Sequence, residues 1–276
     1  MRGKPILLLH GVPLASLTWK RVAPLLAERG HRAVAVDLVG MGESSKPLGF
    51  SYALNDLTGL VEALLMDLAG RQEEGEEAGG RGEPWVVAGH DLGGLLALRL
   101  TARRPELVAG AIALDATVSP DHPFPWITLF AARPSSMAGV FRLGQPGGLR
   151  GILRRLWRPG GEVPAELVEE GVKTFCRPEA VWALAKLIEG VGATPEEELA
   201  ALREELGGVV RPVLVGRGEE DPVLPAEAAA ELVDLIPGAR AAGIAEAGHL
   251  SPLEQPGRVA GLIAGLAEET IGGGAR

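Results

Sequence analysis

The sequence predicts an α/β fold in which a mostly parallel sheet is flanked by helices and carries an inserted helical cap. Short apolar runs that end in Gly or Asp alternate with longer segments of helical periodicity, which is typical of parallel βαβ units. Residues 118–208 break this alternation, because they lack short β-branched runs and resemble several helices separated by Pro and Gly. We therefore expect residues 1–117 and 209–276 to form the core, and residues 118–208 to form a cap over the open end of its sheet.

The individual elements follow from the length and spacing of the apolar residues. Between Leu54 and Leu68, leucine and valine recur at helical spacing and give one apolar face for packing on a sheet. The acidic, glycine-rich stretch Arg71–Glu83 is predicted to be a flexible surface loop. The predicted strands are Ile6–Leu9, Ala33–Val36, Trp85–Ala88, Ala111–Leu114, Val209–Val215 and Arg240–Ile244. The predicted helices are Thr18–Glu28, Ala53–Leu68, Leu92–Ala102, Ala226–Leu235 and Arg258–Thr270.

Composition and charge limit the partners and the location of the chain. The net charge is −9 and there is no long basic tract, which argues against nucleic acids and anionic membranes as partners. Cys176 is the only cysteine, so no internal disulfide can form. The first apolar run, Ile6–Leu9, is too short for a signal peptide or a membrane span. We expect a soluble, cytoplasmic protein that acts on a small molecule.

The most informative motif is Gly89–Gly93 (GHDLG), which lies between an apolar strand and a helix. Small residues two positions before and after the central residue permit a tight turn that lifts its side chain out of the sheet. The central residue of such turns is most often Ser, whereas here it is Asp91. A carboxylate can attack carbon without a base that first removes a proton, and the resulting ester must be cleared by water. The motif therefore predicts a hydrolase that works by two displacements.

Two further residues complete a predicted catalytic set. His249 follows the last strand, and Asp221 follows the fifth strand in a turn with Pro222. Nucleophile, acid and then histidine is the chain order that this kind of fold uses. Asp221 would accept a hydrogen bond from His249 and fix its tautomer. Asp115, at the end of the fourth strand, is a second candidate for the same role.

The segment His10-Gly11-Val12-Pro13 ends the first strand, where parallel-sheet proteins collect their active-site loops. The backbone N–H groups of Val12 and Leu92 are predicted to form an oxyanion hole. The alternative is a strand-ending turn with a packed His10. No set of Cys, His and carboxylates has the spacing of metal ligands, and no Gly-x-Gly-x-x-Gly follows a strand. We expect neither a metal nor a cofactor.

These residues together resemble the α/β-hydrolase superfamily, in its branch of haloalkane dehalogenases and epoxide hydrolases. The motifs that carry the resemblance are His10–Pro13 with Trp19, Asp37–Pro47, and Gly89–Asp91, and the likeness covers nearly everything outside residues 118–208.

The resemblance implies Asp91 as the nucleophile, His249 as the general base for water, and Asp221 as its orienting acid. It also implies Val12 and Leu92 as the amide donors. The sheet of that superfamily has eight strands, and this chain starts only a few residues before the third, so the first two would be missing or lie upstream.

The chain departs from that branch in the groups that stabilise a leaving group. Similar dehalogenases use an indole N–H beside the nucleophile, often with an Asn in the first loop, but Leu92 and Val12 stand here and offer no side-chain donor. Similar epoxide hydrolases use two cap tyrosines, and the predicted cap has none. Similar enzymes for haloacetates have an Arg directly after the nucleophile, where this chain has Leu92. Trp126, Trp157 and Trp182 of the cap are the predicted substrate-binding residues, because an indole N–H could donate to a halide.

Three functions are therefore open. The leading hypothesis is a haloalkane dehalogenase-like hydrolase that acts on small apolar electrophiles and water. The first alternative is an esterase or lactonase, with Asp91 as the base or attacking the acyl group, or an epoxide hydrolase-like activity. The second alternative is a non-catalytic protein of this fold that only binds a ligand. The missing leaving-group donors favour the last possibility, whereas the complete set of Asp91, Asp221 and His249 argues against it.

Overall fold

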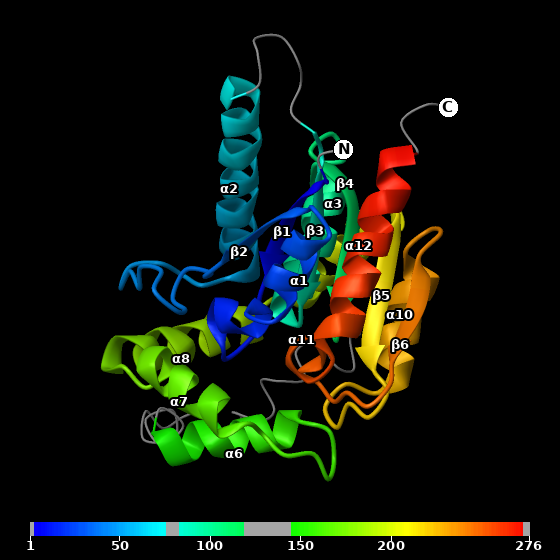
Figure 1. Ribbon diagram of the computed structural model, residues 1–276. Coiled ribbons are helices and arrows are strands. Elements are labelled where there is room, and N and C mark those ends of the chain that lie inside the picture. Colours follow the sequence, from blue (N-terminus) through cyan, green and yellow to red (C-terminus); the bar gives the residue numbers. More distant parts are fainter. Residues whose placement is uncertain (1–2, 76–82, 119–144, 273–276) are drawn as a thin grey trace.

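A computed structural model of the chain describes residues 3–75, 83–118 and 145–272 (Figure 1). In this part of the chain, a six-stranded parallel sheet has the strand order β2-β1-β3-β4-β5-β6. The fold class predicted from the sequence is confirmed. The strands are β1 (Pro5–Leu9), β2 (Arg32–Val36), β3 (Trp85–His90), β4 (Val108–Leu114), β5 (Val213–Gly218) and β6 (Arg240–Ile244).

Helices cover both faces of the sheet, because its central strands are apolar on both sides. In β1, Leu7 and Leu9 pack in one hydrophobic cluster, while Ile6 and Leu8 pack in the other. This division follows from the alternation of side chains along a strand. Helices α1 (Val22–Glu28) and α12 (Pro256–Gly272) cover one face, and α2 (Leu54–Gly75), α3 (Leu92–Arg103) and α10 (Ala226–Leu235) cover the other.

Of the described helices between β4 and β5, three inserted helices lie beyond the carboxyl ends of the strands, at the lower end of the view in Figure 1. They are α6 (Pro146–Leu156), α7 (Ala165–Phe175) and α8 (Pro178–Gly192). The next helix, α9 (Glu196–Gly207), returns to the sheet and packs on α3. There the buried Arg99 Nε lies 3.1 Å from Glu205 Oε2, and Arg103 binds the same carboxylate at 2.9 Å.

Two predicted elements are shorter than the sequence pattern indicates. The helix predicted over Thr18–Glu28 is divided into a 3₁₀ turn, η1 (Ala15–Trp19), and α1, because the Lys20 amide bonds to the Leu17 carbonyl and closes the turn. The strand predicted from Val209 begins only at Val213. Pro212 has no N–H for a ladder of hydrogen bonds, which ends the pairing on its amino-terminal side.

The prediction of a loop over Arg71–Glu83 is wrong for its first residues, because α2 continues to Gly75. Glutamine and glutamate favour helices, and an ion pair at i,i+4 joins Arg71 Nε to Asp67 Oδ2 at 2.7 Å. Residues 76–82 of that stretch lie outside the described residues. Among the described helices, none is both long and apolar enough to cross a bilayer.

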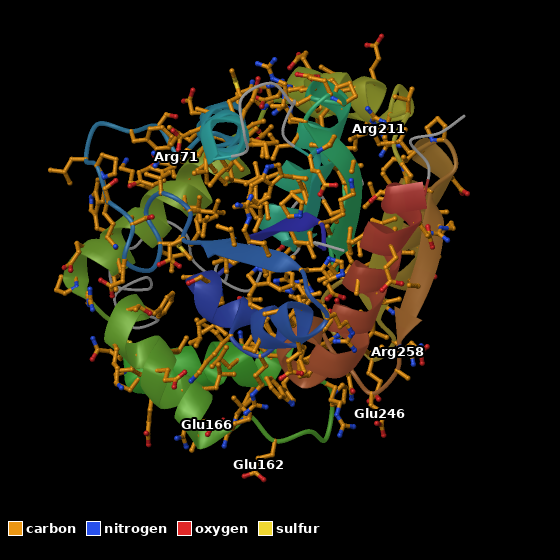
Figure 2. All side chains as sticks on the ribbon, turned by 45° about the horizontal axis from the view of Figure 1, so that its top comes forward. Arg71, Glu162, Glu166, Arg211, Glu246 and Arg258 are labelled. Atoms are coloured by element: carbon orange, nitrogen blue, oxygen red, sulfur yellow. The ribbon has the colours of Figure 1, made fainter. Side chains whose placement is uncertain are left out.

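Charged side chains mostly lie at the periphery, as Arg71, Arg211, Arg258 and Glu162 do in Figure 2. Several ionisable side chains depart from this pattern, and four of them are at most 8% exposed and gather at the carboxyl ends of the strands: Asp91, Asp115, Asp221 and His249. Burying such groups costs free energy unless they are paired or hydrogen-bonded. Their position at the carboxyl ends of the strands therefore marks the candidate site.

A glycine at the start of α3 allows this helix to approach β1. A Cβ at Gly93 would collide with the Leu9 carbonyl group, so Gly93→Ala must push α3 and β1 apart. We expect the free energy of unfolding in urea to fall by about 2–3 kcal/mol. Gly59→Ala is the matched control, because Gly59 is exposed on α2 with open space around it. The control should gain about 0.5–1 kcal/mol, and equal stability of the two variants would contradict this account of the packing.

Candidate active site

Asp91 lies in a sharp turn between β3 and α3, as the Gly89–Gly93 motif predicts. Its backbone has φ 52° and ψ −120°, a conformation that non-glycine residues rarely adopt. A Cβ at Gly89 would collide with the Gly93 carbonyl, so the turn requires the small residues that the sequence places there. Strain of this kind persists only where the surrounding structure holds it, and it is common at functional sites.

Backbone amides surround the Asp91 carboxylate. The Val12 N–H donates to Asp91 Oδ2 at 3.2 Å, and the Leu92 amide also hydrogen-bonds this side chain. A Cβ on Gly11 would lie 2.6 Å from the same oxygen, so only glycine leaves room for it. Burial raises the pKa of Asp91 to about 6, although His249 and the two amides act in the opposite direction. The two predicted amide donors therefore face the Asp91 side chain.

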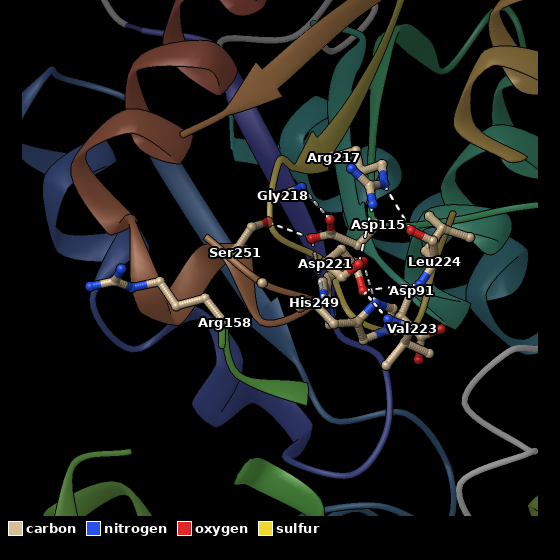
Figure 3. Close-up of polar contacts among 12 residues, drawn as sticks. Asp91, Asp115, Arg158, Arg217, Gly218, Asp221, Val223, Leu224, His249 and Ser251 are labelled. Atoms are coloured by element: carbon tan, nitrogen blue, oxygen red, sulfur yellow. Dashed lines mark hydrogen bonds and ion pairs between the residues drawn. The ribbon is translucent and has the colours of Figure 1, made fainter. Parts of the chain in front are cut away.

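His249 lies between two carboxylates (Figure 3). Its Nδ1 lies 2.8 Å from Asp221 Oδ2, and its Nε2 lies 3.9 Å from Asp91 Oδ1. The other oxygen of Asp221 accepts the amides of Val223 at 2.7 Å and Leu224 at 3.0 Å, which fixes that carboxylate. Within the described residues, the buried His249 Nε2 has no hydrogen-bond partner. Its capacity to form a hydrogen bond is therefore unused among these residues.

The electrostatics of this group favour a charged imidazole. Burial lowers the pKa of His249, but the charge and hydrogen bond of Asp221, together with the charge of Asp91, outweigh it and raise the pKa to about 10. At neutral pH His249 is an imidazolium that lies between the Asp221 and Asp91 carboxylates. Burial raises the pKa of Asp221, but His249 and the two loop amides prevail and lower it.

Of the two predicted acids, Asp221 is hydrogen-bonded to His249, whereas Asp115 bonds to other residues. Asp115 Oδ1 accepts the Gly218 N–H at 2.7 Å, and its Oδ2 lies 2.5 Å from the Ser251 hydroxyl. The described residues contain no cluster of three or more His, Cys, Asp or Glu that could hold a metal ion.

The two other buried histidines near the site hold backbone segments. His90 Nε2 lies 2.6 Å from the carbonyl oxygen of His249. Burial lowers the pKa of His90 to about 3, so its ring is neutral and Nε2–H donates this bond. His10 Nε2 accepts the Leu38 amide at 2.9 Å, which supports a packing role for His10.

The predicted substrate-binding tryptophans do not form one group in the described structure. Trp157 lines a pocket with Leu17 and Leu167. Its indole ring packs closely against Gly161, where a larger residue would have no room. Trp182 packs edge-on against Tyr52, with ring centroids 6.3 Å apart. Neither contact involves Asp91. Trp126 lies outside the described residues, so its role stays a prediction.

Sequence reasoning missed Glu254, which joins the His249 loop to the inserted helices. This residue ends the short helix α11 (Ser251–Glu254), and its carboxylate accepts the Gly248 and Arg158 amides, each at 3.0 Å. The His249 N–H also donates to the Leu156 carbonyl at the end of α6, at 2.8 Å. The available signal was an acid five positions after His249, but only the fold shows that it reaches backbone far away in the sequence.

Comparison with known proteins places the chain in a family. The sequence matches the Alpha/beta hydrolase family over residues 6–262, and the chain belongs to this family. It is a hydrolase of α/β fold. A relative that matches along almost the whole chain is the uncharacterized hydrolase YugF of Bacillus subtilis, 24% identical over 264 residues, which cover 92% of this chain and 86% of that protein.

Other relatives and structures carry more specific names. An epoxide hydrolase of Caballeronia sordidicola is 33% identical over 118 residues, which cover 41% of this chain and 31% of that protein. The structure of AncHLD2, described as an ancestral haloalkane dehalogenase, superposes with a TM-score of 0.76 at 19% identity, over 98% of this chain and 92% of that one. A thermophilic esterase of Thermogutta terrifontis gives 0.75 at 24% identity, over 97% and 90%. At these identities the structures establish the fold alone.

Removal of the Glu254 carboxylate should destabilise the chain. Glu254→Ala leaves the partly buried amides of Gly248 and Arg158 without their acceptor, so we expect the free energy of unfolding to fall by about 1–3 kcal/mol. The measurement is urea denaturation followed by circular dichroism. Glu220→Ala removes an exposed acid from the loop that carries Asp221 and is the control, with an expected change below about 0.5 kcal/mol. A loss no larger than that of the control would show that the Glu254 carboxylate does not stabilise the His249 loop.

Proposed function

We propose that the chain is a haloalkane dehalogenase-like hydrolase in which Asp91 attacks carbon in a small apolar substrate and forms an alkyl ester. The observation that carries this proposal is the hydrogen bond from the Val12 amide to Asp91 Oδ2 at 3.2 Å. An enzyme that attacks an acyl carbon needs such amides for the oxygen of its substrate. Here the carboxylate of Asp91 itself uses them, and its other oxygen, Oδ1, faces His249.

In the first step, Asp91 Oδ1 attacks the carbon atom and the carbon–halogen bond breaks, so the halide leaves with the bonding electron pair. Asp91 Oδ2 becomes the carbonyl oxygen of the ester and stays beside the amides of Val12 and Leu92. We further propose that α6–α8 belong to a cap, as part of residues 118–208, and that this cap encloses the substrate. Their position beyond the carboxyl ends of the strands supports this.

The second step uses the change of charge that the first step produces. Once Asp91 is an uncharged ester, His249 loses one of the carboxylates that raise its pKa, and its proton can leave to solvent. Nε2 then takes a proton from water as the water oxygen attacks the carbonyl carbon of Asp91. Negative charge develops on Oδ2, where the two amides stabilise it. Collapse breaks the bond from the carbonyl carbon to the alkoxy oxygen, and the alkoxide takes the proton from His249. The carboxylic acid that remains on Asp91 then passes its proton to His249 Nε2, which restores the carboxylate and the imidazolium.

Epoxide opening is a second candidate that one observation favours. His249 is an imidazolium at neutral pH, and its unpartnered Nε2 lies 3.9 Å from Asp91 Oδ1. It could therefore protonate the oxygen of an epoxide as Asp91 opens the ring, without a pair of tyrosines. Ester hydrolysis and binding without turnover are the remaining outcomes of a substrate panel.

Substitution of the two central residues should separate the two chemical steps. Asp91→Ala should lower turnover of 1-bromobutane or styrene oxide by about 10³-fold or more, because no ester can form. His249→Gln should let the ester form but not decay, so intact-protein mass spectrometry should show a stable adduct on Asp91. The double variant should show none. Unchanged turnover in Asp91→Ala, or activity on p-nitrophenyl acetate alone, would refute the proposal.

The pKa of Asp91 predicts a pH dependence for the first step. Burial raises this pKa to about 6, and only the carboxylate attacks, so the rate of ester formation should fall about tenfold for each pH unit below about 6. Rapid-quench mass spectrometry of the wild-type protein measures this rate. In His249→Gln the midpoint should move to higher pH, because the imidazolium that lowers the pKa of Asp91 is gone. A midpoint near that of an ordinary aspartate, about 4, would contradict the role of burial.

A further inference from the structure

Asp115 is a buried carboxyl group that takes no part in the proposed steps, although it lies beside the residues that do. It follows β4, is 1% exposed, and has its backbone in the left-handed region at φ 51°. Its amide donates to the Gly216 carbonyl at 2.8 Å. A strained residue that side-chain and backbone bonds hold in place is a candidate for a functional role.

The two oxygens of Asp115 bind two different loops (Figure 3). Oδ1 accepts the N–H of Gly218, the last residue of β5, which lies shortly before Asp221 in the sequence. Oδ2 lies 2.5 Å from the hydroxyl of Ser251, the first residue of α11 and close to His249 in the sequence. A single side chain therefore joins the loop of the predicted acid to the loop of the predicted base.

His90 completes the support beneath the base. Its Nε2–H donates to the His249 carbonyl at 2.6 Å, and the same nitrogen lies 3.8 Å from Asp115 Oδ2. The backbone of His249 is thus fixed from β3, while Asp115 fixes the residues that follow it from β4. The side-chain contact that depends on this support is the 2.8 Å bond between His249 Nδ1 and Asp221 Oδ2.

We propose that Asp115 is a positioning residue of this site, which aligns Asp221 with His249 through its two hydrogen bonds. The inference rests on the roles proposed above for Asp221 and His249.

The ionisation of Asp115 agrees with this role. Burial and the neighbouring Asp221 carboxylate raise the pKa of Asp115 to about 8, against the lowering effects of His249, Ser251 and Gly218. The side chain is therefore uncharged at neutral pH, and the adjacent His90 is neutral as well. An asparagine can reproduce the bonds of a neutral Asp115, because its carbonyl can accept from Gly218 and its NH₂ can donate to Ser251 Oγ.

The test compares Asp115→Asn with Asp115→Ala in the full-length protein, by two measurements. The first is the decay of the Asp91 ester formed with 1-bromobutane, followed by mass spectrometry. The second is the downfield proton resonance of His249 Nδ1–H, assigned by its absence in His249→Gln. In Asp115→Ala we expect the ester to decay about 10- to 100-fold more slowly, since the displacement of a catalytic group by about 1 Å can lower the rate by as much. The resonance should be lost through exchange. In Asp115→Asn both measurements should return to wild-type values, whereas a side chain that only filled the space would not restore them.

Ser251→Ala keeps the test decisive if Asp115→Ala does not fold, because it removes one of the two bonds and leaves Asp115 in place. It should give an intermediate loss in both measurements. The proposal is overturned if Asp115→Asn fails as severely as Asp115→Ala, since the charge would then be essential, or if Asp115→Ala and Ser251→Ala both behave as wild type. If the wild-type protein forms no ester, the proposed function fails, whereas the resonance still decides the role of Asp115.

Discussion

The site depends on one electrostatic arrangement, a buried imidazolium held between two carboxylates. His249 is fully buried, lies 2.8 Å from Asp221 and 3.9 Å from Asp91, and would not be charged in this environment without them. Removing charges from water is costly, and their mutual attraction offsets this cost only when the geometry is good and the remaining polar atoms are hydrogen-bonded. The amides of Val12, Val223 and Leu224 meet that condition for the two carboxylates.

The parallel sheet makes this arrangement possible, because the ends of β3, β5 and β6 lie at the same edge. Asp91, Asp221 and His249 each follow a different one of these strands. Their positions are therefore set by backbone pairing within the sheet, which side-chain fluctuations hardly change. The inserted helices touch the same loops through Leu156, Arg158 and Glu254. A shift of α6 would thus be transmitted directly to the backbone of His249.

Much of the fold could be predicted from the sequence, since strand length and alternation appear directly in the pattern of apolar residues. The turn around Asp91 and the pairing of Asp221 with His249 were also accessible, because small residues and chain order carry that information. The extension of α2 to Gly75 was not, because the glutamates that suggested a loop are also good helix formers. The contacts of Asp115, His90 and Glu254 join residues distant in sequence, and no local pattern encodes such contacts.

The origin of the oxygen in the product distinguishes attack by Asp91 from direct attack by water. In a single turnover of excess enzyme with 1-bromobutane in H₂¹⁸O, water adds to the carbonyl carbon of the ester, and the alcohol takes its oxygen from Asp91. The account predicts unlabelled butanol and ¹⁸O in the peptide that contains Asp91, measured by mass spectrometry after digestion. Labelled butanol from the first turnover, with an unlabelled Asp91 peptide, would contradict it.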